Sequence, residues 1–272
     1  MRVGLVLFCL ALNLVYARKI HVDPSGRTEF IIWNVGQGSW ATLRQLESCH
    51  HFDAGGERNP LKRMKPHCQT VPNVMSFSHW DLDHVRFAPH AQKTLSSTCV
   101  AHWPAGPHAK YKQKYMKDLS PCASTVQPEL AELKRASKAR WLKPQRASPN
   151  ASSRVFVLAR SILLPGDSTD AEEKAWAVNE DRLSGVRLLV LGHHGSRTST
   201  SEKLLKSLPQ LRQAIASARS KKYGHPHKEV ADRLKSFGIA LLRTEDWGDL
   251  RFEIKCYKGG NPCSNSSQPA RK

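Results

Sequence analysis

Ser78-His79-Trp80-Asp81-Leu82-Asp83-His84 is the stretch of sequence that decides the fold. It places two imidazoles and two carboxylates close together, directly after the apolar run 74–77. A strand ending at Phe77 would bring this cluster to the edge of a sheet, where a tight turn can direct its side chains inward. Imidazole and carboxylate together are ligands that suit Zn²⁺, and also Mn²⁺ or Fe²⁺. The spacing therefore predicts a metal site, and the alternative is a polar loop that is rich in His and Asp.

Other chemically active residues follow apolar runs in the same way. They are Asp53 in His51-Phe52-Asp53-Ala54-Gly55-Gly56, Asp167 after Leu163-Leu164-Pro165-Gly166, His193-His194 after Leu189-Val190-Leu191-Gly192, and the run Tyr223-Gly224-His225-Pro226-His227. A turn aspartate, a helix cap or a surface histidine would explain each of them alone. Together with the first cluster they predict a single site assembled where several strands end.

The pattern of apolar runs predicts many short strands and few helices. Strands are expected at 29–33, 40–46, 74–77, 154–158, 161–164, 188–191, 239–243 and 250–255, and helices at 128–141 and 228–237. Proline in the first turn, early acidic residues and late basic residues favour the helix at 128–141. This alternation favours a layered α/β arrangement over an all-helical or all-β domain.

The first residues are predicted to be a secretory signal peptide. Arg2 precedes an apolar run at 3–15 that is short for a membrane span, and Val15 and Ala17 provide the small residues of a cleavage site after Ala17. The expected organisation is a signal peptide at 1–17, one domain at 18–258 and a C-terminal tail at 259–272. We expect the mature protein to be periplasmic or secreted, without stable insertion in a membrane.

The signal peptide contains one of the seven cysteines, so six remain in the mature chain. An even number in an oxidising compartment favours disulfides, although some of these residues could be buried thiols. Cys99 with Cys122 and Cys256 with Cys263 are the first candidates because each pair is close in the chain. The other pairings stay open.

The formal net charge of +19 favours a polyanion as partner, such as nucleic acid, anionic lipid or an acidic polymer. The alternative is a basic, solvated surface. Much of the charge falls at 110–146, where lysines alternate with Tyr111 and Tyr115. Such tyrosines can stack on bases, or they can cover a core from an ordinary exposed helix.

The whole set of motifs resembles the metallo-β-lactamase-fold domain of ComEC-type competence proteins. The resemblance rests on the clusters quoted above and on Asn34-Val35-Gly36-Gln37-Gly38-Ser39 and Gly195-Ser196, and it extends over residues 29–253. It implies an αββα sandwich in which metal ions lie along one edge of two packed sheets. The membrane portion of those proteins has no counterpart here, so a role in DNA uptake is not implied.

The family pattern also implies the roles of individual residues. The implied metal ligands are His79 and Asp81 for a first ion, Asp83, His84 and His193 for a second ion, and Asp167 as the bridge. His193 is preferred because it follows the strand directly, which leaves His194 to contact substrate, and the reverse assignment stays open. Asp53 is expected to orient His79 or a turn amide from behind the ligands. The expected cofactor is one or two Zn²⁺ ions, with Mn²⁺ as an alternative.

The first metal site departs from the family pattern. Asn34 and Ser39 stand where the family usually has Asp, and the loop around Asn150 stands where the wider superfamily offers a histidine. The third ligand of the first ion is therefore not identified. His90, His102 and His108 are candidates, and nothing in their sequence settings selects one of them.

Two metal ions would lower the pKa of a bridging water and would stabilise the attacking and leaving oxygens together. The expected catalytic residues are Asp83, His194 and His227, and the expected substrate-binding residues are Ser196, Tyr223, His225 and His227. The predicted function is an exported metal-dependent phosphodiesterase, a nuclease acting on DNA or RNA. One alternative is an esterase, lactonase or β-lactamase that acts on a small molecule, and another is a non-catalytic polyanion-binding protein.

Overall fold

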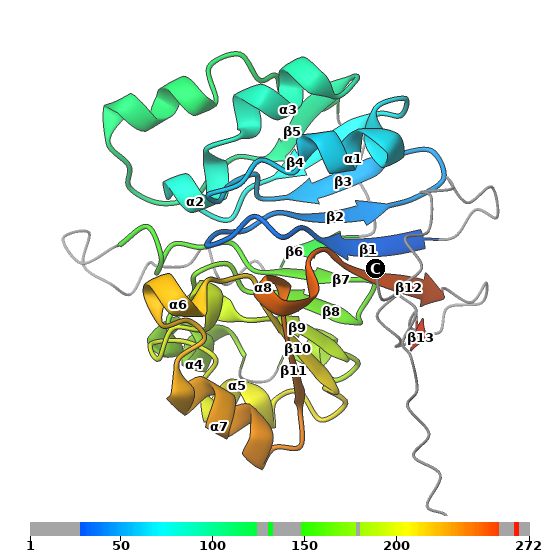
Figure 1. Ribbon diagram of the computed structural model, residues 1–272. Coiled ribbons are helices and arrows are strands. Elements are labelled where there is room, and N and C mark those ends of the chain that lie inside the picture. The colour runs from blue at the N-terminus through cyan, green and yellow to red at the C-terminus, as the bar shows by residue number, and fades with distance from the viewer. Residues whose placement is uncertain (1–27, 124–129, 133–147, 178–179, 256–263, 267–272) are drawn as a thin grey trace, which may run out of the picture.

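The protein consists of two β-sheets packed face to face, with helices on the outer face of each sheet (Figure 1). The computed structural model describes residues 28–123, 130–132, 148–177, 180–255 and 264–266. The predicted αββα sandwich is confirmed, and it is the architecture of the metallo-β-lactamase fold.

The first sheet has, within these residues, seven strands in the order β13-β12-β1-β2-β3-β4-β5. Their bounds are β1 (Thr28–Ile32), β2 (Ala41–Arg44), β3 (Cys49–Phe52), β4 (Asn73–Ser76), β5 (Thr98–His102), β12 (Leu250–Lys255) and β13 (Ser264–Ser266). Neighbouring strands are antiparallel, except that β3, β4 and β5 run parallel. The short strand β13 lies within the range predicted to be a tail.

The second sheet has the order β11-β10-β9-β8-β7-β6 in the described part of the chain. Its strands are β6 (Leu130–Glu132), β7 (Phe156–Leu158), β8 (Ile162–Leu164), β9 (Leu188–Val190), β10 (Gln213–Ala216) and β11 (Ala240–Arg243). Strands β8 to β11 run parallel, and β6 and β7 are antiparallel to their neighbours.

Helices cover both outer faces. On the first sheet they are α1 (Leu61–Cys68), α2 (Leu82–Val85), α3 (Ala88–Thr94) and the 3₁₀ helix η1 (Lys110–Tyr115). The segments that follow the strands of the second sheet are α4 (Asp170–Trp176), η4 (Asp181–Leu183), η5 (Gly192–Gly195), α5 (Glu202–Lys206), α6 (Ser220–Tyr223), α7 (Lys228–Ser236) and α8 (Thr244–Trp247), and of these α4, η4, α5 and α7 pack on its outer face. In Figure 1, α2 and α6 lie at the same end of the two sheets.

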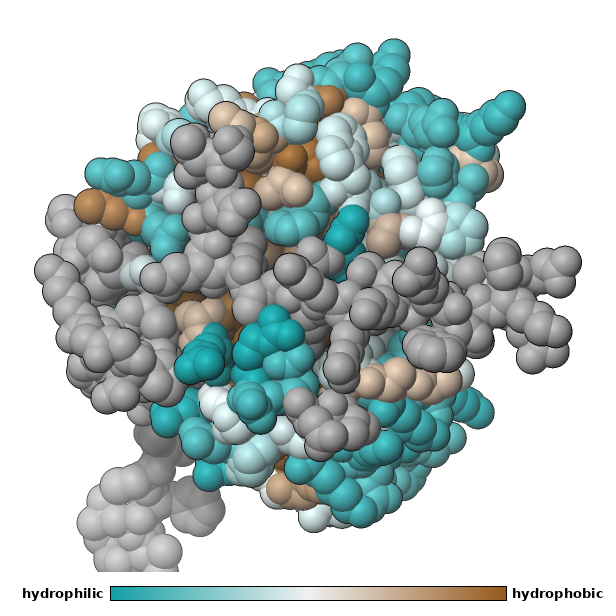
Figure 2. Space-filling view, turned by 180° about the vertical axis from the view of Figure 1, so that it is seen from behind, coloured by the Kyte–Doolittle hydropathy of each residue, from teal (hydrophilic) through white to brown (hydrophobic). Residues whose placement is uncertain are grey.

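Within the described residues, three apolar clusters hold these layers together. The central cluster lies between the sheets and includes Phe30, Phe52, Phe156 and Phe252. A second cluster packs the first sheet against its helices, and a third packs the second sheet against α4, α5 and α7. Hydrophilic side chains cover much of the described surface when the molecule is seen from behind (Figure 2).

The parallel strands explain why the predicted site forms at one edge. Parallel neighbours present their carboxyl ends at the same side of a sheet. Asp53 follows β3 and the His79–His84 cluster follows β4, while Asp167 follows β8 and the pair His193-His194 follows β9. The two facing sheets therefore deliver polar side chains to a common edge.

All eight predicted strands are confirmed with ends shifted by no more than two residues, and α7 occupies the predicted helix at 228–237. The helix predicted at 128–141 is wrong where the structure describes it, because Leu130–Glu132 is the strand β6 and pairs with β7. Backbone pairing with an existing sheet edge outweighs local helix signals there. The rest of that prediction lies outside the described residues.

The described residues contain two disulfides, Cys99–Cys122 as predicted and Cys49–Cys68. Disulfides persist in oxidising compartments, so both are consistent with an extracytoplasmic location. The predicted Cys256–Cys263 pair and the signal peptide lie outside the described residues. No helix in the described ranges is both long and apolar enough to cross a bilayer.

Candidate metal centre

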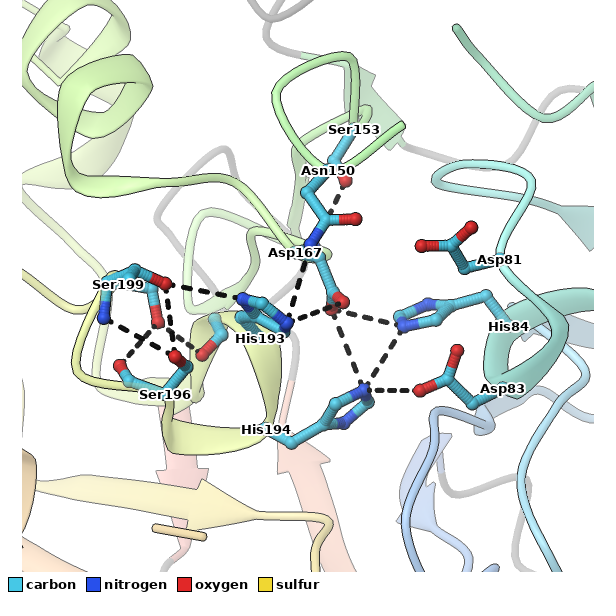
Figure 3. A network of polar contacts seen from close by, with 12 residues as sticks. Asp81, Asp83, His84, Asn150, Ser153, Asp167, His193, His194, Ser196 and Ser199 are labelled. Atoms are coloured by element: carbon cyan, nitrogen blue, oxygen red, sulfur yellow. Dashed lines mark hydrogen bonds and ion pairs between the residues drawn. The ribbon is translucent and has the colours of Figure 1, made fainter. Parts of the chain in front are cut away.

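Asp167 lies at the centre of a buried cluster of imidazoles and carboxylates (Figure 3). On one side, its Oδ1 atom is 3.1 Å from His84 Nε2 and 3.7 Å from His194 Nε2. His194 Nε2 is also 3.2 Å from Asp83 Oδ2 and 3.3 Å from His84 Nε2. Asp83, His84 and His194 form one of the described groups whose ligand atoms are close enough to hold a metal ion.

The Oδ2 atom of Asp167 faces a second set of ligands. It is 3.8 Å from His79 Nε2 and 3.7 Å from His193 Nε2. His79 Nε2 is in turn 3.5 Å from Asp81 Oδ2. Donor atoms that share one ion at metal–ligand distances of about 2.0–2.2 Å lie a little over 3 Å apart. Asp167 thus stands between two candidate positions, which we call the first site (His79 and Asp81) and the second site (Asp83 and His84).

The family pattern, together with the position of His193 directly after the strand, led to the prediction that His193 is the histidine of the second site. In the structure it is His194 that approaches Asp83 and His84, while His193 faces the other oxygen of Asp167. His193 is also 3.4 Å from Asn150 Nδ2, so the Asn-containing loop does reach this part of the site. The geometry therefore favours the reverse of the preferred assignment.

The backbone of the loop after β9 explains how neighbouring histidines reach different sites. His193 (φ 47°) and His194 (φ 55°) both adopt the left-handed conformation, which is uncommon for residues other than glycine. Each such residue costs about 1–3 kcal/mol and persists only where the surroundings impose it. Here the loop is held by the backbone hydrogen bonds from His193 N to Gly166 O and from His227 N to Gly195 O.

Asp53 contacts the turn amide and His84 rather than His79. Its Oδ1 accepts hydrogen bonds from Ser78 N (2.7 Å) and Ser78 Oγ (2.9 Å), and its Oδ2 is 2.7 Å from His84 Nδ1. Ser78 Oγ also lies 3.0 Å from His79 Nδ1, and Ser153 Oγ lies 3.2 Å from the same atom. Both imidazoles are thereby fixed by Nδ1, which leaves Nε2 directed at Asp167.

A glycine makes this close packing possible. A Cβ atom on Gly55 would lie 2.1 Å from the carbonyl carbon of Asp83, where no side chain fits. The two loops that follow β3 and β4 are also joined by backbone hydrogen bonds from Ala54 N to His84 O and from Phe87 N to Ala54 O. The Asp53-Ala54-Gly55-Gly56 motif is thus needed for the approach of the two loops.

The cluster fits a divalent metal ion. His79 Nε2 is fully buried and has no hydrogen-bond partner among the described residues, yet it faces carboxylate oxygens of Asp81 and Asp167 at 3.5 and 3.8 Å. An unpaired buried nitrogen is costly unless something binds its lone pair. Imidazole nitrogens and carboxylate oxygens are ligands for such ions, and both candidate groups in the described residues combine them.

The electrostatics of the cluster favour charged carboxylates. Burial opposes the charged form of His84 and His194, but the nearby carboxylates, Asp167 foremost, raise the pKa of both imidazoles above the usual value. Burial likewise opposes ionisation of Asp167 and Asp83, and the same imidazoles lower the pKa of both carboxyls. The imidazole of His79, more than the ammonium of Lys112, holds the pKa of Asp81 at about 2.

The other predicted site residues lie beside the cluster on the side of the second sheet. His225 is 6.1 Å from His193 and 4.6 Å from His227, measured between ring centroids. Burial and the neighbouring imidazoles lower the pKa of His225 to about 4. Tyr223 is 41% exposed and donates a hydrogen bond to Glu57, which places it at the rim. Ser196 Oγ contacts Thr198 Oγ1, 3.0 Å away.

The three candidates for the missing ligand lie elsewhere. His102 contacts Ser76 and its ring packs against Phe156, His108 stacks on Trp80, and His90 packs against Phe87. Neither of the metal-binding groups found in the described residues includes any of them.

Sequence reasoning missed several residues that shape the site. Ser78 links Asp53, His79 and His84, Gln37 contacts His225 Nδ1 at 3.0 Å, and Lys112 binds Asp81. Ser78 had a signal, since it directly precedes the cluster. Lys112 had none, because it is one of several lysines in a basic run far along the chain.

Comparisons with known proteins agree with the resemblance seen in the motifs. No family model matches the chain. The chain is 32% identical over 116 residues to ComE operon protein 3 of Bacillus subtilis and 36% identical over 102 residues to competence protein ComA of Neisseria gonorrhoeae. It is also 36% identical over 94 residues to recombination protein 2 of Haemophilus influenzae. These matches cover 35–41% of this chain and only 12–15% of the relatives.

Solved structures with a similar arrangement include the metallo-β-lactamase-fold protein YhfI from Bacillus subtilis and a diphosphatase of the PhnP family. The TM-scores are 0.48 and 0.46, each with 11% identity, and the alignments cover 84% and 83% of this chain and 100% and 98% of those chains.

The αββα sandwich is that of the metallo-β-lactamase fold, and the His/Asp cluster at its edge could hold a divalent metal ion. The chain resembles ComEC-type competence proteins over about 37–41% of its length.

Proposed function

We propose that this protein is an exported, metal-dependent phosphodiesterase that cleaves nucleic acid. The observation that carries the proposal is the position of Asp167, whose two carboxylate oxygens face two different sets of His and Asp side chains. A carboxylate placed in this way can bridge two cations. Two cations held together suit the cleavage of phosphate esters, in which charge develops on the attacking and the leaving oxygen.

The proposed ligands of the second site are Asp83, His84, His194 and Asp167. The proposed ligands of the first site are His79, Asp81 and Asp167, with His193 as the neighbouring imidazole. Zn²⁺ is the preferred ion because imidazoles and carboxylates are mixed in both sets, and Mn²⁺ is the alternative. When bound, such ions would supply positive charge to a phosphate oxygen and activate water as the nucleophile.

The side chains around the ions have separate roles in the proposal. His227 Nδ1 accepts a hydrogen bond from Arg197 N at 3.0 Å. The neutral ring therefore carries its proton on Nε2, from which it can be donated to a leaving oxygen. His225, whose pKa is about 4, is uncharged at neutral pH and serves to position the substrate. Tyr223 offers an exposed ring at the rim.

Nucleic acid is the proposed substrate because of the charge and the surroundings of the site. The chain carries a formal net charge of +19. The 3₁₀ helix η1 contains three lysines and borders the first site, and its Tyr111 is 56% exposed. Tyr115 instead packs against the core, so only one of the two predicted tyrosines is available for stacking from this segment. The relatives are named as competence and recombination proteins, which also favours DNA.

The test is to incubate the protein with single-stranded DNA, double-stranded DNA and RNA in the presence of Zn²⁺, Mn²⁺ or Mg²⁺. Metal-dependent cleavage by the wild type, and its loss in Asp83→Asn and Asp167→Asn, is the expected result. Equal cleavage by the wild type and both variants would contradict the proposed metal centre. Turnover of nitrocefin or a lactone without cleavage of nucleic acid would favour a small-molecule hydrolase, and salt-sensitive DNA binding without any cleavage would favour a binding protein.

A further inference from the structure

A lysine side chain reaches into the candidate metal centre. Lys112 Nζ is 2.7 Å from Asp81 Oδ1, and the lysine side chain is only 13% exposed. The other oxygen of Asp81, Oδ2, faces His79 Nε2 at 3.5 Å. This one carboxylate is therefore shared between an ammonium group and the side of the imidazole that a metal ion would use.

The fold fixes the position of Lys112. Before η1, residue 105 forms a backbone bridge with His79, and the ring of His108 stacks on Trp80 with centroids 3.9 Å apart. After η1, Met116 is buried in the core beneath the first sheet. The segment is thus anchored on both sides of the lysine, and the contact with Asp81 is not a chance position of a free surface side chain.

The two sites differ in this respect. Asp83, in the second site, pairs with His194 and belongs to a group of atoms that could hold a metal ion. Asp81 belongs to neither of the two such groups among the described residues. Those two groups also share His84, and one imidazole nitrogen binds one ion, so they cannot both be filled as they stand. A second ion would bind beside His79, where Asp81 is the nearest additional carboxylate, and Lys112 holds that residue.

An ammonium group and a divalent cation compete for the same carboxylate, and they repel each other when both are present. This repulsion is substantial because solvent screens partly buried charges only incompletely. We propose that Lys112 competes with a metal ion for Asp81 and makes the first site the weaker of the two, so that the sites fill in sequence. The inference rests on the metal-dependent function proposed above.

Metal titration of the full chain tests this role separately from catalysis. Metal-free wild type, Lys112→Met and Lys112→Gln would be titrated with Mn²⁺ and with Zn²⁺ by calorimetry, and the bound ions counted by elemental analysis. The expected result is that both neutral variants bind the weaker ion about ten- to a hundredfold more tightly than the wild type. If the wild type retains only one ion, the variants should retain two. Binding of the tighter ion should not change.

Two control variants separate a competing charge from other effects. Lys112→Arg keeps a cation beside Asp81 and should behave as the wild type does. Lys114→Met removes the same charge from the same segment, where the lysine packs over Tyr115 instead, and should leave metal binding unchanged. Circular dichroism and thermal melting would confirm that each variant is folded.

The inference is overturned if the neutral Lys112 variants bind the weaker ion no better than the wild type, or bind it less well. Weaker binding would mean that the ammonium orients Asp81 for the metal. Either result leaves the proposed phosphodiesterase intact, provided that the wild type binds metal and cleaves nucleic acid. Conversely, a wild type that binds metal as expected but cleaves no nucleic acid would contradict the proposed function and leave the role of Lys112 standing.

Discussion

The chain contains two His-His pairs, and they have opposite settings. His50-His51 lies in the middle of β3, so its rings point to opposite faces of the first sheet: His50 stacks on Phe52, and His51 contacts Trp40, Thr42 and Asn73. His193-His194 lies in a left-handed turn, and both rings face Asp167. The same dipeptide is thus part of a sheet in one place and of the candidate metal centre in the other.

The difference shows what distinguishes a structural histidine from a candidate ligand. Burial lowers the pKa of His50 and His51, the latter to about 4, so both rings are neutral. Burial also acts on His194, but Asp167 and Asp83 more than offset it and raise its pKa. Both pairs contain buried rings, so burial does not separate them. A histidine that is a candidate metal ligand has carboxylates beside its ring, and a structural histidine does not.

The largest expected effect comes from removing the carboxylate that serves both sites. Asp167→Asn should lower metal-dependent cleavage about 10³-fold, because a loss of about 4 kcal/mol of charge stabilisation corresponds to that factor. Initial rates and metal content would be measured beside Asp170→Asn, a change at an exposed residue of α4. Comparable rates for the two variants would mean that Asp167 is no more important for cleavage than a residue outside the candidate metal centre.

The second prediction concerns the structural pair. His51→Leu should lower the free energy of unfolding by about 2–4 kcal/mol, because the partners Thr42 and Asn73 lose their buried hydrogen bonds. Metal content should stay at the wild-type level. Denaturant unfolding and elemental analysis of the same preparation would check both statements. A loss of metal without a loss of stability would contradict the structural role of His51.

The third prediction sharpens the role of the carboxylate behind His84. Asp53→Asn keeps the size of the side chain but removes its charge, and it should weaken metal binding about 10- to 100-fold. Competition with a chelating dye would measure the affinity. Unchanged affinity, with the fold intact by circular dichroism, would show that the 2.7 Å contact with His84 does not influence the metal site.

The smallest expected effect is a pH dependence of stability in the first sheet. The pKa of His51 is about 4 in the folded protein, below the value of about 6.5 in an unfolded chain, so the unfolded state binds more protons between these values. The contribution of neutral His51 to the free energy of unfolding is therefore complete above pH 6.5 and is lost as the pH falls toward 4. For metal-free protein we expect the free energy of unfolding to fall by about 1–2 kcal/mol from pH 7 to pH 5. The loss should be smaller in His51→Leu, and equal slopes would contradict the assignment.

Most of the fold was predictable because its signals are local. Apolar runs gave β1, β4, β8, β9 and β12, and the polar clusters after those runs identified the edge where the site forms. The helix prediction at 128–141 failed in the described part because pairing between β6 and β7 depends on residues about 25 positions away. Local propensity contains no information about such a partner.

The site residues that belong to sequence motifs could be predicted. Those that approach the site from segments without a motif could not. Asp53, His84 and Asp167 come together as the strand ends suggested. The preference for His193 over His194 in the second site could not be settled from sequence, because it depends on two left-handed residues in the turn. Lys112 approaches from a separate segment whose path no motif defines.

The turn at His193 and His194 has a consequence for how metal would be captured. In the proposed centre, adjacent residues supply imidazoles to two neighbouring ions. Once one ring is bound, the other is held at a high effective concentration beside the second position, as in a chelating agent whose arms are joined by a short, stiff link. Because the conformation is imposed during folding, neither ring has to be ordered when an ion arrives, and the loop acts as a preassembled chelate.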